Sequence, residues 1–457
     1  MATIADPLTT PSEHVFGHPR GLVYLAFTEI WERFSYYGMS ALLVLYMTQT
    51  LLLPGHAEHV VGLAGFRQSL EAVFGPLPPQ AFASQIYGLY TGFVYFMPLI
   101  GGWIADRWFG ARRVVIAGAL LMSAGHFAMA FQASFLFALA LLIVGTGFLK
   151  GNITAQVGRL YRPDEETLRV RGYTLFSTGI NVGAVAGPIA CGLLAQLYGW
   201  HAGFAAAGTL MLAALVTYLA GQPYLPAERP ARQREAAAAA RMTAAERRTV
   251  ALLVATMAIT IFQSVCYYQY FNTGLLWVDT HVDLATPWGH FPAAWFHSLD
   301  SLVAILVVPL LIGFWGWQSS RGREPGDIGK IGWGAAIQTA SALTIAFCAW
   351  LAGSGKVAIW LPLIGFSIQG IAFLYYWPTL LALVSQSAPA KVNAMLIGVA
   401  FLTMFVTGLL VGWIGTFYGP LGPVRFWLLQ AAISATGALL VLVVGRALGR
   451  ELEPRPA

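Results

Sequence analysis

Residues 27–38 read FTEIWERFSYYG and place Glu29, Glu32 and Arg33 inside an apolar run that extends from residue 21 to residue 53. That run is longer than the stretch of about 20 residues that a helix needs to cross a hydrocarbon core. A charged side chain at the bilayer centre costs on the order of 3 kcal/mol. The three charges are therefore expected to pair with one another and to face a polar cavity.

The spacing of these charges puts them on one face of a helix, because Glu29 precedes Glu32 by three residues and Arg33 by four. Tyr36 and Tyr37 continue the same stretch. Such a face can hold a zwitterion, because a guanidinium binds a carboxylate through two hydrogen bonds and tyrosines offer hydroxyl groups and flat walls. The alternative is an ion-pair cluster that only holds helices together, although apolar residues often replace such a cluster at little cost.

The composition extends this interpretation to the whole chain, since 57% of the 457 residues are hydrophobic and 10% are charged. A soluble domain carries about 25% charged residues. Apolar runs recur along the chain and predict an all-α membrane protein with twelve transmembrane helices. In the first half they cover 21–53, 84–106, 114–131, 135–158, 172–198 and 202–222. In the second half they cover 250–278, 292–317, 331–353, 358–387, 393–418 and 425–446.

The net charge of +6 follows the predicted topology. When both termini are placed in the cytoplasm, the outer loops hold only Arg67, Lys356 and Arg425, and most other basic residues lie on the inner side. This bias is the positive-inside rule. The sequence thus predicts an integral protein of the cell (inner) membrane, a monomer with both termini cytoplasmic and with no nucleic-acid partner.

The twelve spans divide evenly around one charged linker. We expect an N-terminal six-helix bundle at 1–222, a cytoplasmic linker at 223–249 and a C-terminal six-helix bundle at 250–457. This is the layout of a parallel-repeat transporter, whose substrate site lies near the midplane between the halves. The outer stretch 54–80 is expected to be an irregular loop with solvated His56 and His59.

Two further charges interrupt apolar spans, Lys150 in the fourth and Asp300 in the eighth. Unpaired, the five intramembrane charges would together cost roughly 10 to 15 kcal/mol. Cys191, Cys266 and Cys348 lie in apolar segments and are expected to pack as small hydrophobic residues. The histidines of the apolar spans, His126 and His297, show no ligand spacing such as His-x-x-x-His, so neither a metal, a cofactor nor an enzymatic activity is expected. A receptor built on a transporter fold stays open as an alternative.

Several motifs resemble those of one transporter family. The pattern Glu-x-x-Glu-Arg-Phe-x-Tyr-Tyr-Gly within 27–38 resembles the first-helix signature of the proton-dependent oligopeptide transporters of the major facilitator superfamily, and GHPRGL at 17–22 is similar to the family's lead-in. GGWIADRWFG at 101–110, with Arg112 and Arg113, resembles both a family signature and the superfamily's loop motif. GTGFLKGN at 145–152 and INVG at 180–183 are similar to two more family motifs.

The resemblance implies roles for individual residues. Arg33 and Lys150 would bind the substrate carboxylate, and Glu29 and Glu32 would take part in proton coupling. The residues implied in the pocket are Tyr36, Tyr37, Tyr95 and Asn181. The residues implied in the inner gate are Asp106, Arg107 and Arg112. There Asp106 would meet a helix N-terminus and a neighbouring arginine. The resemblance also implies two six-helix bundles, alternating access and proton-driven import of di- and tripeptides.

Other positions depart from the family pattern. Ser40 stands where the family has an arginine, and Tyr268-Gln269 stands where it has a glutamate before a glutamine. These two family groups form a gating ion pair, so both partners are lost together. Phe373, five residues before Pro378, replaces the glutamate that receives a peptide's amino terminus. We still expect Tyr268, Gln269 and Phe373 to line the substrate site.

One new acid compensates for these losses in our hypothesis. HSLD at 297–300 stands where the family has Gln-Ser-Leu-Asn, so Asp300 replaces an amide by a titratable group. Asp300 would receive the substrate amine or the coupling proton. The alternative is that Asp300 pairs with Lys150 or caps a neighbouring backbone. The sequence thus predicts a proton-coupled symporter of di-/tripeptides or peptide-like small carboxylates. The competing interpretation is a diverged relative that imports or exports a non-peptide anion, siderophore or metabolite.

Overall fold

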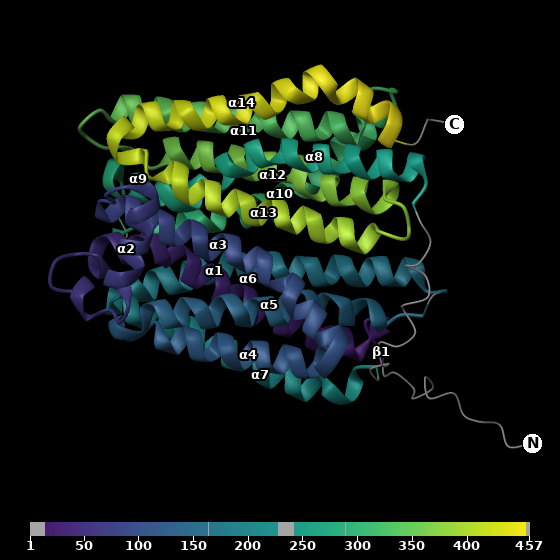
Figure 1. The fold of residues 1–457 in the computed structure, drawn as a ribbon, viewed down its shortest axis with the longest axis horizontal. Coiled ribbons are helices and arrows are strands. Elements are labelled where there is room, and N and C mark those ends of the chain that lie inside the picture. Colours follow the sequence, from purple (N-terminus) through teal and green to yellow (C-terminus); the bar gives the residue numbers. More distant parts are fainter. Residues whose placement is uncertain (1–13, 163, 227–241, 288, 454–457) are drawn as a thin grey trace, which may run out of the picture. The chain divides into compact units, whose positions relative to one another are not determined.

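The computed structural model describes residues 14–162, 164–226, 242–287 and 289–453, and Figure 1 shows that these residues are almost all helical. The chain forms two compact units. Unit 1 comprises Met1–Met39 and Met97–Gln233, and unit 2 comprises Ser40–Phe96 and Arg234–Ala457. The boundaries fall inside two helices, so each of these helices contributes residues to both units. The expected division into bundles 1–222 and 250–457 stays a prediction.

In the described part of the chain before the linker there are six long helices, and each corresponds to one predicted span. They are α1 (Arg20–Tyr46), α3 (Pro79–Ile104), α4 (Ala111–Ala128), α5 (Phe135–Arg159), α6 (Glu166–Tyr198) and α7 (Trp200–Gly221). π-helical turns extend α1 through Met47–Leu51 (η1) and α3 through Ala105–Phe109 (η3). The short helices are η2 (Ala57–His59), α2 (Leu63–Phe74), η4 (Gln132–Ser134) and η5 (Gln222–Tyr224).

Six spans follow the linker, again at the predicted places. The first is α8 (Ala244–Gln269), continued by the π-helical η8 (Tyr270–Gly274) and by α9 (Leu275–His281). The second is η9 (Ala293–Ser298) followed by α10 (Leu299–Ser319). The others are α11 (Asp327–Ala352), α12 (Trp360–Ser387), α13 (Asn393–Gly415) and α14 (Tyr418–Leu452). Gly422, with φ +70°, interrupts α14 just before Pro423, so the regular helix resumes close to the predicted start at residue 425.

Three pairs of short strands, each strand two residues long, lie in described segments outside the long helices. β1 (His14–Val15) pairs antiparallel with β2 (His18–Pro19), and β4 (Ala285–Thr286) pairs antiparallel with β5 (Gly289–His290). β3 (Val282–Asp283) pairs parallel with β6 (Val357–Ala358), which ties the segment after α9 to the segment before α12.

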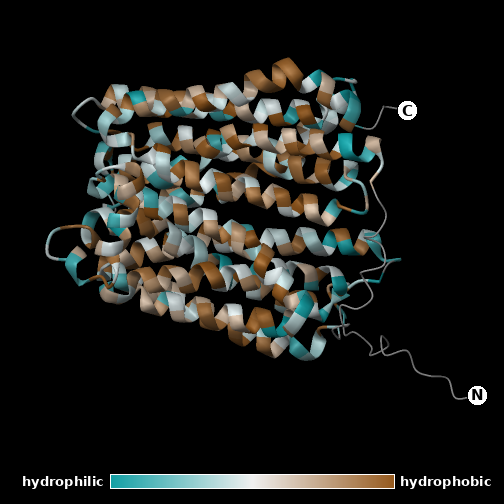
Figure 2. Ribbon diagram, viewed as in Figure 1, coloured by the Kyte–Doolittle hydropathy of each residue, from teal (hydrophilic) through white to brown (hydrophobic). Residues whose placement is uncertain are grey.

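Ten helical segments of the described residues are long and apolar enough to cross a membrane. Figure 2 shows hydrophobic residues along the lengths of the long helices and hydrophilic residues gathered toward the loops at their ends. The two long helices outside these ten are α1, which carries three charged residues in its interior, and α4, which begins with Ala111, Arg112 and Arg113. The chain is an integral membrane protein with the predicted all-α fold.

The prediction of an irregular loop at 54–80 is wrong, because α2 occupies much of it. Arg67 and Glu71 of α2 form an ion pair of 3.0 Å, one helical turn apart. The same Glu71 carboxylate accepts the backbone N–H of Leu77, also over 3.0 Å. These contacts fix the turn that leads into α3. The predicted linker is described only at its ends, where Thr243 and Glu246 form a capping box that starts α8.

Candidate functional site

Arg33 lies between the two acidic residues of α1 in unit 1. Its Nε is 3.1 Å from Oε1 of Glu29 and donates a hydrogen bond to Oε2 of Glu32. The three side chains are almost fully buried, with exposed fractions of 2%, 0% and 3% for Glu29, Glu32 and Arg33. Burial strengthens the attraction between these charges, because less water screens them.

Lys150 of α5 completes this cluster, since its ammonium interacts electrostatically with Glu29, Glu32 and Arg33. Two carboxylates therefore face two basic groups. The Arg33 guanidinium also lies over the ring of Tyr36, 5.3 Å from its centroid, and Tyr37 meets that ring edge-on. The aromatic rings thus form one wall of the cluster, within reach of a cation–π contact.

Close packing of α1 against α6 holds this cluster in place. A Cβ atom at Gly183 would lie 2.9 Å from the Cβ of Arg33, and one at Gly187 would lie 2.9 Å from the backbone nitrogen of Gly38. A Cβ at Gly179 would lie 3.1 Å from Ile30. Such glycines let two membrane helices approach each other closely. Asn181 of α6 lies two residues before Gly183, which places it near the level of Arg33.

The cluster retains polar atoms that no described group uses. Oε2 of Glu29, Oε1 of Glu32 and Nη2 of Arg33 are buried without a hydrogen-bond partner among the described residues. A buried polar atom without a partner is costly, so such atoms commonly have a water or a ligand as partner. The cluster therefore has the capacity to bind a further polar group.

A second group of predicted site residues gathers in unit 2. The hydroxyl groups of Tyr95, from α3, and Tyr268, from α8, are 2.6 Å apart. Tyr267 donates a hydrogen bond of 2.8 Å to Oδ2 of Asp300, while Oδ1 has no partner among the described residues. The ring of Phe373 stacks on that of Tyr267 with 5.0 Å between centroids. Three helices and the start of α10 thus place an acid among aromatic rings.

Gln269 does not join this aromatic group. Its Nε2 donates to the carbonyl of Val411 on α13 over 2.9 Å, and its Oε1 accepts from Asn272 and Thr273. These contacts bind α8 to α13 and provide hydrogen-bond partners for the side chains of Asn272 and Thr273 in the π-helical turn that follows α8. The side chain is fully buried.

The predicted gate residues lie at the end of α3 and the start of α4. Asp106 and Arg107 are exposed and sit in the π-helical turn η3. Arg112 donates to the carbonyls of Leu225 and Pro226, at 2.9 Å for the latter. The structure thus ties Arg112 to the segment after α7, and the described ion pairs do not include Asp106.

The sequence analysis missed Tyr267. Tyr267 and Tyr268 are adjacent, so their side chains point about 100° apart on the helix and only one matches the family position. The contact of Tyr267 with Asp300 depends on how α8 packs against α10, which no local pattern reveals. The only signal in the sequence was that Asp300 is a lone acid in an apolar span and therefore needs a hydrogen-bond donor such as the Tyr267 hydroxyl.

A family model described as Major Facilitator Superfamily matches residues 25–412. The chain belongs to this superfamily. A di-/tripeptide transporter of Lactococcus lactis subsp. cremoris is 28% identical to it, over 94% of this chain and 95% of that relative. An uncharacterized transporter of Bacillus subtilis is 40% identical over 213 residues, which cover 46% of this chain and 39% of that relative.

Solved structures of peptide transporters resemble the chain as well. The structure of a peptide transporter POT mutant in complex with alafosfalin superimposes with a TM-score of 0.83, at 28% identity, over 97% of this chain and 98% of that one. The resemblance to the oligopeptide transporters that the sequence motifs indicated is thereby confirmed. Family and fold are those of transporters.

Proposed function

We propose that this protein is a proton-coupled symporter of di-/tripeptides or peptide-like small carboxylates, working by alternating access. The observation that carries the proposal is the buried cluster in which Glu29 and Glu32 contact Arg33 and Lys150 completes the charge balance. The relatives named as di-/tripeptide and peptide transporters support this substrate class.

Carboxylate binding is the role of the two basic groups. A guanidinium donates two parallel hydrogen bonds to a carboxylate, and Nη2 of Arg33 has no hydrogen-bond partner among the described residues. Lys150 adds a second positive charge. Tyr36, Tyr37 and Asn181 supply hydroxyl, amide and ring surfaces beside this point and would contact the remainder of the substrate.

Charge balance supports proton coupling at the same place. Two acidic and two basic side chains sum to zero when all are ionised. A substrate carboxylate adds one negative charge to a buried cluster, where an unbalanced charge is costly. Uptake of one proton by Glu32 or Glu29 restores neutrality and releases Arg33 for the substrate. Loss of that proton to the cytoplasm re-forms the internal pairs and expels the substrate.

Asp300 is the second acid in our proposal, because it receives the substrate amine or a coupling proton. It has one oxygen held by Tyr267 and one without a partner among the described residues. Tyr95, Tyr268 and Phe373 would line the adjoining pocket. Gln269 would hold α8 in position beside this pocket through its hydrogen bond to Val411.

We further propose that Asp106, Arg107 and Arg112 form the inner gate. The protein would be a monomer in the cell (inner) membrane, with both termini cytoplasmic.

Proteoliposomes with an imposed pH gradient test the proposal. Wild-type protein should accumulate a labelled dipeptide against its gradient. Glu32→Gln should lose this accumulation but keep exchange of labelled for unlabelled substrate, because binding remains when the proton site is permanently neutral. Glu58→Gln, in the outer connection, is the matched control. Undiminished pH-driven accumulation in Glu32→Gln would remove the coupling role of this residue.

A second candidate function is transport of a non-peptide solute. Phe373 stacks on Tyr267, and Tyr268 bonds Tyr95, at two positions where the family carries acids. These apolar and phenolic groups favour a substrate without a terminal amine. Competition decides between the two functions, because dipeptides should block uptake only if the peptide assignment is correct.

A further inference from the structure

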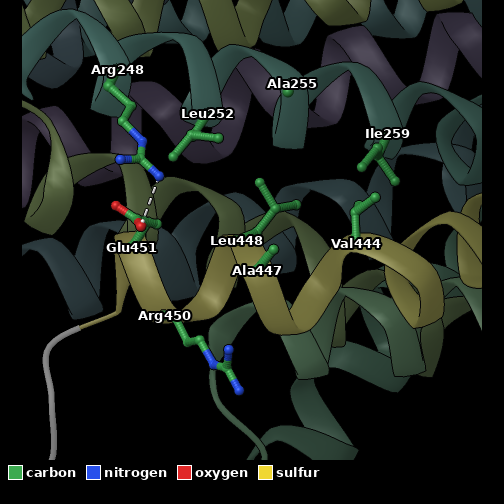
Figure 3. A pocket seen from close by; sticks show the side chains of 9 residues that line it. All are labelled: Arg248, Leu252, Ala255, Ile259, Val444, Ala447, Leu448, Arg450 and Glu451. Carbon is green, nitrogen blue, oxygen red and sulfur yellow. Dashed lines mark hydrogen bonds and ion pairs between the residues drawn. The ribbon is translucent and has the colours of Figure 1, made fainter.

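A groove runs between α8 and α14 in unit 2 and involves none of the residues assigned to substrate or proton. It encloses a cavity of about 440 Å³. Figure 3 shows its α8 wall, which carries Arg248, Leu252, Ala255 and Ile259. These residues are spaced by four, three and four positions, so they follow one another along a single face of the helix.

The facing wall on α14 follows the same rule. Val444, Ala447, Leu448 and Glu451 recur at intervals of three, one and three, again on one face. Ala255 and Ala447 are exposed, and their short side chains leave the space that forms the groove. Leu252, Ile259, Val444 and Leu448 give it an apolar lining.

The two helices come close together at one end of the groove. A Cβ at Gly437 of α14 would lie 3.2 Å from the Cβ of Phe262, so the two helices nearly touch beyond Ile259 and Val444. The other end carries Arg248, and the α8 face from there to Ile259 spans about 16 Å at 1.5 Å per residue. This length is similar to one leaflet, about half of a 30 Å hydrocarbon core.

The end of the groove at Arg248 carries an excess of positive charge. Arg248 and Glu451 form an ion pair of 2.9 Å across the groove, which compensates the one acid in its lining. Arg450 also lines the groove, and the ion pairs of the described residues do not include it. Figure 3 shows its side chain extending from α14 away from the Arg248–Glu451 pair. An anionic group at this end would therefore meet an uncompensated guanidinium.

We propose that this groove binds one anionic phospholipid of the phosphatidylglycerol type, with its phosphate at Arg450 and Arg248 and one acyl chain between α8 and α14. The apolar lining, the length of one leaflet and the charge at one end together match the two chemical parts of this ligand. Basic pockets between membrane helices on the cytoplasmic side are known to bind anionic headgroups. The proposal does not depend on the substrate that the protein carries.

Lipid titration of the purified full-length protein tests the proposal. Phosphatidylglycerol is added in mixed micelles, with phosphatidylcholine as the reference, and binding is followed by native mass spectrometry and by the thermal midpoint. Ala255→Trp should abolish the preference for phosphatidylglycerol, because the indole fills the groove. Ala251→Trp, on the same helix but outside the lining, should keep it.

Charge variants give two opposite expectations. Arg450→Gln should weaken phosphatidylglycerol binding about fivefold, the effect of one basic residue at an anionic lipid surface. Glu451→Gln should strengthen it by a similar factor, because Arg248 then loses its intramolecular partner. Arg247→Gln removes the same charge from an exposed position outside the lining and should change binding less than twofold, well below that fivefold effect.

Three results would overturn the proposal. One is equal phosphatidylglycerol binding by wild type, Ala255→Trp and Arg450→Gln. Another is full reproduction of the thermal shift by sodium phosphate, which would make the site one for a soluble anion. The third is a dimer that Ala255→Trp converts to a monomer without any lipid effect, since the groove would then be a contact between two copies of the chain.

Discussion

The hydroxyl groups of Tyr95 and Tyr268 lie 2.6 Å apart, and their rings meet edge-on. The family pattern implies a glutamate at the position of Tyr268, where this chain has a phenol in a hydrogen bond with Tyr95. The Tyr95 ring also stacks on Phe401 of α13, which fixes its position from the other side. A neutral contact thus joins α3 to α8 at this point.

This contact predicts a coupling between the two positions. Tyr268→Phe and Tyr95→Phe should each lower the free energy of unfolding by about 1 kcal/mol, and the double variant should lose no more than either single one. Thermal unfolding of the detergent-purified protein measures this cycle. Tyr198→Phe, at an exposed hydroxyl, serves as the control. Fully additive losses would mean that the two hydroxyl groups do not bond to each other.

The hydrogen bond from Tyr267 to Asp300 predicts two different kinetic phenotypes. Asp300→Asn should weaken the response of uptake to pH, because one titratable group is gone while those of Glu29 and Glu32 remain. Tyr267→Phe should keep that response but raise KM about fivefold, because the carboxylate stays ionisable and only loses the donor that orients it. Initial uptake rates at several pH values separate these effects. Tyr375→Phe on α12 is the control, and unchanged uptake together with an unchanged pH profile in Asp300→Asn would end the proposed role of this acid.

The crossing of α1 and α6 predicts a steric cost at Gly183. An added Cβ would lie 2.9 Å from the Cβ of Arg33 and 3.0 Å from the backbone nitrogen of Phe34, so α1 must shift. Gly183→Ala should therefore destabilise the protein by about 1–3 kcal/mol and reduce uptake. Gly313→Ala in α10 is a matched control, because no heavy atom lies within 4 Å of its added Cβ. Equal thermal midpoints for the two variants would contradict such close packing.

Helix number was predictable from the sequence, but helix length was not. An apolar run reports the thickness of the hydrocarbon core, whereas a helix continues into water until a cap or a turn residue stops it. For this reason α6 begins at Glu166, six residues before the predicted span, and α8 begins at the capping box of Thr243 and Glu246. The helix α2 was missed because its 12 residues are too short to show as a span.

The two clusters differed in how far the sequence could define them. Glu29, Glu32 and Arg33 lie within five residues on one helix, so the 3.6-residue period alone predicts that they meet. Asp300 and Tyr267 come from different helices, and their contact arises from tertiary packing. The same reason explains Gln269, whose bond to Val411 of α13 turns a predicted pocket residue toward the interior of the bundle.

The turn between α2 and α3 predicts a local dependence on pH. Oε1 of Glu71 accepts the backbone N–H of Leu77 and pairs with Arg67, and these two contacts lower the pKa of Glu71 from its ordinary value of 4.5. A lowered pKa in the folded state means that the carboxylate stabilises this turn at pH values above 4.5 and that the contribution disappears as the pH falls through the lowered value. The turn should therefore loosen in acid.

Glu71→Gln reproduces the uncharged state at every pH. At neutral pH its amide hydrogens in residues 75–80 should exchange faster than those of the wild type, because the neutral amide oxygen is a weaker acceptor for Leu77 and forms no ion pair with Arg67. When the exchange is measured at pH values below the lowered pKa of Glu71, the amide hydrogens of the two proteins should exchange at the same rate, since the wild-type carboxylate is then protonated. Glu58→Gln, which affects only the turn at Gly55, should match the wild type in these residues throughout. Identical exchange of Glu71→Gln and wild type at neutral pH would show that this carboxylate does not hold the turn.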